Sequence, residues 1–73
     1  MKRYAYTDLL GEVYGQNPDL AAKLIGIGTK IPAYEVSDFA AQSRKGLENL
    51  GLSSSEIGFL DGVLEDKYSL KLG

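Results

Sequence analysis

The sequence predicts an all-α fold, a compact bundle of four short helices in a single domain that spans residues 1–73. Three observations lead to this prediction. Apolar residues recur in four segments at the helical spacing of about 3.6 residues. Glycine and proline separate these segments. A chain of 73 residues is also too short for more than one hydrophobic core.

The first helix is predicted from about Thr7 to Tyr14. Thr7 is suited to cap the helix, Asp8 complements the positive end of the helix dipole, and Gly15 suits the left-handed residue that often follows a helix. The predicted buried face contains Tyr6, Leu9, Leu10, Val13 and Tyr14.

The second helix is predicted to begin at Asn17-Pro18-Asp19. Asn accepts a hydrogen bond from a free amide at the helix start. Proline at the first helical position costs no helix hydrogen bond, because the amide at that position has no acceptor within the helix. The helix should run to about Ile25 with Leu20, Ala21, Leu24 and Ile25 on its buried face. Gly26-Ile27-Gly28-Thr29 is predicted to break the helix, while the point near Pro32 where the chain resumes stays open.

The third helix is predicted as one element from Val36 to Leu50, ending at Gly51. Its apolar face would contain Val36, Phe39, Ala40, Ser43, Leu47 and Leu50. Ser43 lies in the middle of this face. There it would allow close helix packing or bond a carbonyl one turn earlier.

The fourth helix has the most specific local signal in the chain, a capping box in which Ser53 and Glu56 satisfy each other's backbone amides. It should run to about Tyr68 and form a helical hairpin with the third helix across Gly51-Leu52. Its predicted buried face contains Ile57, Leu60, Val63, Leu64 and Tyr68.

The two ends of the chain alternate apolar and polar residues, as short strands do. These segments are residues 2–6 and 69–72, and they could pair with each other. An isolated two-stranded ladder is marginal in water, so packed or frayed coil is the other interpretation.

Composition excludes several classes of function. The chain has no Cys and no His, which excludes a disulfide framework, a zinc finger, a thiol nucleophile and an imidazole base. We therefore expect no enzyme, no cofactor and no metal site. No secretory signal is recognisable, and no uncharged run approaches the roughly 20 apolar residues of a spanning helix. These features predict a cytoplasmic protein that does not act at a membrane.

The charge pattern argues against nucleic-acid binding. Residues 20–27 approximate the spacing of a helix-turn-helix motif, but the glycine comes one residue late and Pro32 lies where the recognition helix should begin. A second candidate over residues 47–64 has no Lys or Arg between Gly46 and Asp66, and a helix entering a groove needs cations. A DNA-binding regulator would require convergence of Lys2, Arg3, Lys30, Arg44 and Lys45 despite the net charge of −2.

The predicted fourth helix carries the strongest candidate for a binding surface. Gly58 and Gly62 lie one turn apart on the side away from its apolar stripe, Phe59 lies at the edge, and glycines at this spacing let another backbone approach closely. The other interpretation is close packing of this strip within the chain. Asp61, Glu65 and Asp66 add negative charge, but no loop supplies the further oxygen ligands of a calcium site.

From these residues we expect a small non-catalytic protein-binding module or adaptor. Its partner would be another protein or a second copy, docking on Gly58, Phe59, Asp61, Gly62, Glu65 and Asp66. Two alternatives belong to other classes: a helix-turn-helix-like DNA-binding regulator, and a structural subunit of a larger assembly. The isolated chain of such a subunit would self-associate or fold poorly, because its own core is small.

Overall fold

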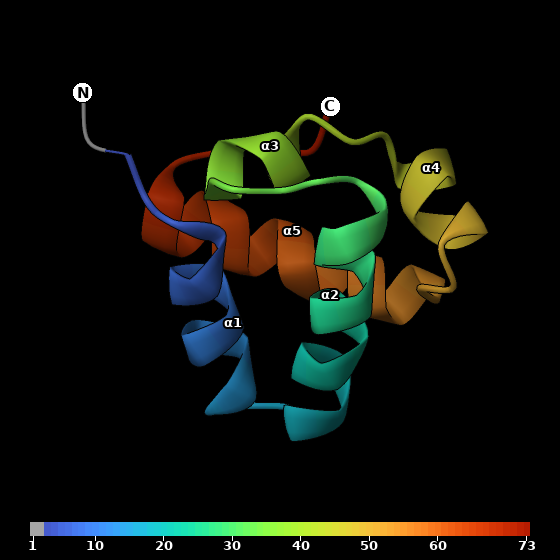
Figure 1. The fold of residues 1–73 in the computed structure, drawn as a ribbon, viewed down its shortest axis with the longest axis horizontal. Coiled ribbons are helices and arrows are strands. Elements are labelled where there is room, and N and C mark those ends of the chain that lie inside the picture. The colour runs from blue at the N-terminus through green and yellow to red at the C-terminus, as the bar shows by residue number, and fades with distance from the viewer. Residues whose placement is uncertain (1–2) are drawn as a thin grey trace. The chain divides into compact units, whose positions relative to one another are not determined.

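The ordered elements of the protein are helical. The structure is a computed structural model that describes residues 3–73, drawn in Figure 1. Its helices are α1 (Tyr6–Tyr14), α2 (Pro18–Lys30), α3 (Val36–Ala40), α4 (Arg44–Asn49) and α5 (Ser54–Tyr68). The all-α class is confirmed, but residues 3–73 form five helices instead of the predicted four.

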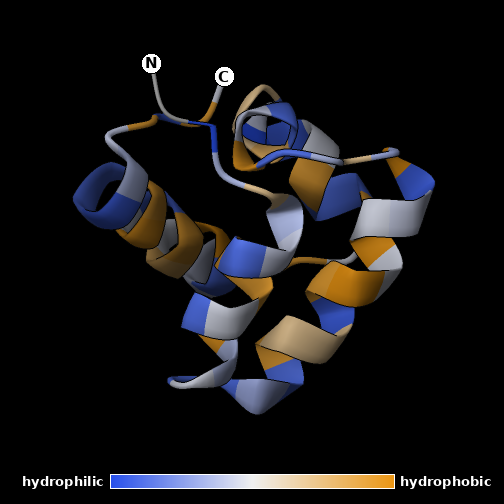
Figure 2. Cartoon of the chain, turned by 60° about the vertical axis from the view of Figure 1, so that its left-hand side comes forward, coloured by the Kyte–Doolittle hydropathy of each residue, from blue (hydrophilic) through white to orange (hydrophobic). Residues whose placement is uncertain are grey.

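Residue contacts divide the chain into two compact units, Met1–Phe39 and Ala40–Gly73. The first contains α1, α2 and most of α3, and the second contains α4 and α5. A single domain over residues 1–73 stays a prediction. Figure 2 shows hydrophobic and hydrophilic residues alternating around the helices, which is the pattern of amphipathic helices.

In the first unit, α1 and α2 pack against each other and lie side by side in Figure 1. Their buried side chains are Tyr6, Leu9, Val13, Leu20, Ala21, Leu24 and Ile27. Two residues predicted on these faces are exposed instead, Tyr14 by 64% and Ile25 by 59%. Ile25 is exposed because successive helical residues are about 100° apart, which places it beyond Ala21 at the end of the buried arc.

Both ends of α1 differ from the prediction. The N-cap is Ala5, and Thr7 lies inside the helix without capping it. The amide of Tyr6, at the start of the helix, instead donates to the carbonyl of Tyr34 at 2.9 Å. A residue distant in sequence thus accepts a hydrogen bond from an amide that has no partner within the helix. Gly15 has a right-handed φ of −62°, so the predicted left-handed ending is wrong.

The start of α2 is confirmed, whereas its predicted break is wrong. Asn17 Oδ1 accepts from the amide of Leu20 at 3.1 Å, and Pro18 is the first helical residue. The helix continues through both glycines of residues 26–29 to Lys30. The same stretch carries the buried side chain of Ile27, and its burial outweighs the roughly 0.5 to 1 kcal/mol that each glycine costs a helix.

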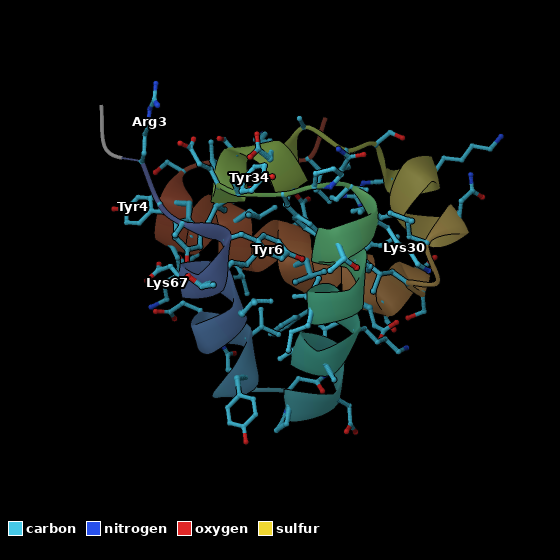
Figure 3. The ribbon with its side chains drawn as sticks, viewed as in Figure 1. Arg3, Tyr4, Tyr6, Lys30, Tyr34 and Lys67 are labelled. Carbon is cyan, nitrogen blue, oxygen red and sulfur yellow. The ribbon has the colours of Figure 1, made fainter. Side chains whose placement is uncertain are left out.

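Tyr6 connects α1 to α2 and explains one of these glycines. Its side chain is buried, its ring centroid is 5.9 Å from that of Phe39, and its hydroxyl donates to the carbonyl of Leu24 at 2.7 Å. Figure 3 shows Tyr6 between the two helices. A Cβ on Gly28 would lie 2.6 Å from Tyr6 Cε2. Gly28 therefore provides space for the ring and does not interrupt the helix.

Because the phenol of Tyr6 is buried, we expect the folded protein to lose stability at alkaline pH. Burial raises the pKa of its phenol above the ordinary value of about 10. Because the folded state holds this proton more tightly, the stabilisation is fully present below about pH 10 and is lost as the pH rises through the raised pKa. Urea unfolding from pH 7 to 11 should show that the difference in free energy of unfolding between the parent chain and Tyr6→Phe becomes smaller above pH 10. Parallel pH curves for the two chains would contradict this account.

The predicted third helix is two helices with a break between them. α3 ends at Ala40, and Ser43 is the N-cap of α4, where its Oγ accepts from the amide of Gly46 at 3.0 Å. The prediction of one helix over residues 36–50 is therefore wrong, as are both roles predicted for Ser43. The physical reason is that a serine hydroxyl competes for backbone amides and favours caps over helix interiors.

Of the two interpretations left open for the ends, pairing with each other is not seen among residues 3–73. The backbone around Ala5 instead forms an isolated antiparallel bridge with Glu35, and the amide of Val36 donates to the carbonyl of Tyr4 at 2.9 Å. Residues 69–73 form no strand. Lys2, the first residue of the predicted N-terminal strand, lies outside the described residues.

The start of α5 matches the prediction in full. Ser53 Oγ accepts from the amide of Glu56 at 3.2 Å, and Glu56 Oε1 accepts from the amide of Ser53 at 2.9 Å. Leu52 and Ile57 are buried at the two staple positions. Gly51, in the turn before the helix, has a left-handed φ of 105°. The helical hairpin does not form as predicted, because its first arm is only the short α4, which contacts α5.

Candidate functional site

The candidate surface lies on the solvent side of α5. The helix buries Ile57, Leu60, Val63 and Leu64. Exposed on its other side are Gly58, Gly62, Glu65 and Asp66, so the division of the helix into two faces agrees with the predicted phase. We call Gly58, Phe59, Gly62, Glu65 and Asp66 the α5 outer face.

The two glycines of this face are open. A Cβ added to Gly58 or to Gly62 would meet no atom within 4 Å. Close packing of the glycine strip within the chain, the other interpretation of the sequence, is therefore not seen among the described residues. Neither glycine serves a turn or a close contact there, in contrast to Gly28 beside the Tyr6 ring.

Phe59 has an intermediate position. Its side chain is half-buried, while its neighbour Leu60 is fully buried. The ring thus lies at the border between the buried face and the α5 outer face, as its place at the edge of the apolar stripe predicts. A half-buried aromatic side chain still has apolar surface to contribute to a contact.

The acidic residues do not form one cluster. Asp61 is half-buried and its Oδ2 accepts from Arg44 Nη2 at 2.7 Å, which is also an ion pair. Its charge is therefore partly neutralised from α4, while Glu65 and Asp66 are exposed. Within residues 3–73 no group of three or more acidic side chains is placed to hold a metal ion.

Arg44 is the residue that sequence reasoning missed at this site. It precedes Asp61 by 17 positions and belongs to another helix. No local spacing rule relates two residues separated by a helix, a turn and half of a second helix. The Arg44 side chain is 57% accessible and that of Asp61 27%, so solvent screens the ion pair and its contribution to stability is small.

The first unit exposes aromatic residues that the sequence did not single out. Tyr34 is 80% exposed and Tyr4 36%, and Arg3 extends away from the ribbon in Figure 3. Arg3 forms a 3.6 Å ion pair with Glu35, although 82% of its side chain is accessible. The paired backbone around Ala5 and Glu35 holds these side chains on one segment of the unit.

Two of the basic residues that DNA binding would require are engaged in ion pairs. Arg3 pairs with Glu35, and Arg44 pairs with Asp61. Lys30 and Lys45 are exposed in different units, and Lys2 lies outside the described residues. The first helix-turn-helix candidate also loses its turn, because α2 is continuous through Gly26 and Ile27.

Comparison of the chain with protein-family models, with curated proteins and with solved structures gave no significant match. The described helices include none that has the length and apolar character needed to cross a membrane.

Proposed function

We propose that the protein is a cytoplasmic, non-catalytic protein-binding module or adaptor that docks its partner on the α5 outer face. The observation that carries the proposal is the open state of Gly58 and Gly62. Together the two residues cost the helix about 1 to 2 kcal/mol relative to alanine. No contact among the described residues requires glycine at either position. A partner that packs closely against the two glycines would explain why the helix retains them despite their low helix propensity.

The residues around the glycines indicate the chemistry of such a partner. Gly58 and Gly62 leave room for a helix backbone to approach closely, and Phe59 offers apolar contact on one border. Glu65 and Asp66 are exposed beside the glycines and carry negative charge. A partner helix with small residues along its contact face and basic residues at its rim fits this surface.

Adding two methyl groups tests the proposal. In Gly58→Ala/Gly62→Ala, the added Cβ atoms meet open space, so we expect the free energy of unfolding to rise by about 1 to 2 kcal/mol. The same methyl groups should block the partner. The measurement is affinity capture from a nuclease-treated lysate of the source organism, with mass spectrometry at low and high salt. The expected result is a stoichiometric protein that the parent chain retains and the double variant loses.

Gly11→Ala is the matched control. Gly11 is also exposed in a helix, and a Cβ there would meet no atom within 4 Å. This variant should gain stability and keep the partner. Loss of the partner in both variants, or in neither, would refute docking on the α5 outer face. Capture that disappears with nuclease or high salt would instead support the DNA-binding alternative, and recovery of the bait alone would support a self-assembling structural subunit.

Phe59→Ala separates docking from folding at the border of the surface. Because the ring is half-buried, we expect partner affinity to fall at least roughly tenfold while helicity by circular dichroism stays nearly unchanged. A steep drop in melting temperature would show that Phe59 acts mainly in the core, and the residue would then leave the proposed surface.

A further inference from the structure

We draw no further inference here: the strongest candidate, the aromatic surface patch of Tyr4 and Tyr34 on the two segments paired around Ala5 and Glu35, is exposed to solvent, and nothing in the structure of residues 3–73 shows what covers it.

Discussion

Phe39→Ala is expected to leave the protein largely unfolded at room temperature. The Phe39 side chain is completely buried, and its ring lies 5.9 Å from the buried ring of Tyr6 in the same unit. Truncation removes the ring contacts and leaves a cavity, which costs about 3 to 5 kcal/mol. The free energy of unfolding of a small domain is only about 5 kcal/mol or a little more. The measurement is urea unfolding followed by circular dichroism and tyrosine fluorescence.

Ile25→Ala is the control for this prediction. Ile25 is a large aliphatic residue that is 59% exposed, and its truncation should change the free energy of unfolding by only about 0.5 kcal/mol. Leu60→Ala tests the second unit in the same way, because Leu60 is completely buried in α5, and about 2 to 5 kcal/mol should be lost. Equal effects of Phe39→Ala and Ile25→Ala would show that the burial described for the first unit is wrong.

Gly28→Ala is expected to destabilise the protein, although alanine is the better helix former. The new Cβ would lie 2.6 Å from Tyr6 Cε2. The ring cannot easily give way, because it is buried and its hydroxyl is bonded to the carbonyl of Leu24. Forcing a methyl group into such a contact costs about 1 to 3 kcal/mol, which exceeds the gain of about 1 kcal/mol in helix propensity.

Gly26→Ala should have the opposite sign. Gly26 lies in the same helix two residues earlier, and a Cβ there would meet no atom within 4 Å. The substitution should therefore stabilise α2 by about 0.5 to 1 kcal/mol. Thermal and urea unfolding of the two variants, measured side by side, give the sign directly. If both substitutions stabilise, Tyr6 does not pack on Gly28; if both destabilise, α2 does not continue through Gly26.

Local chemistry was sufficient to predict the helix class and the best-defined helix starts. Asn17 with Pro18, and Ser53 with Glu56, are caps whose donors and acceptors lie within three residues of each other. Such interactions depend on few neighbours and can be read from spacing alone. The same holds for the phase of α5, where the periodicity correctly separates buried Leu60 and Leu64 from exposed Gly58 and Gly62.

Predictions failed where a residue responds to a distant part of the chain. The sequence predicts Gly28 as part of a helix break, but Gly28 accommodates the ring of Tyr6, which lies 22 positions earlier. The alternation at the two ends leaves both pairing and coil open, and in the structure the N-terminal segment pairs around Glu35 while the amide of Gly73 donates to the carbonyls of Ala40 and Gln42. Each outcome depends on which segments meet, and that is a tertiary property.

The candidate site shows the same division. The sequence by itself determined that Gly58 and Gly62 share a helix face with Glu65 and Asp66, because helical periodicity places them there. Only the tertiary structure decided that this glycine strip is open and that Asp61 is paired with Arg44. Periodicity states which residues lie together on one helix, whereas burial and ion pairing depend on what the rest of the chain places beside them.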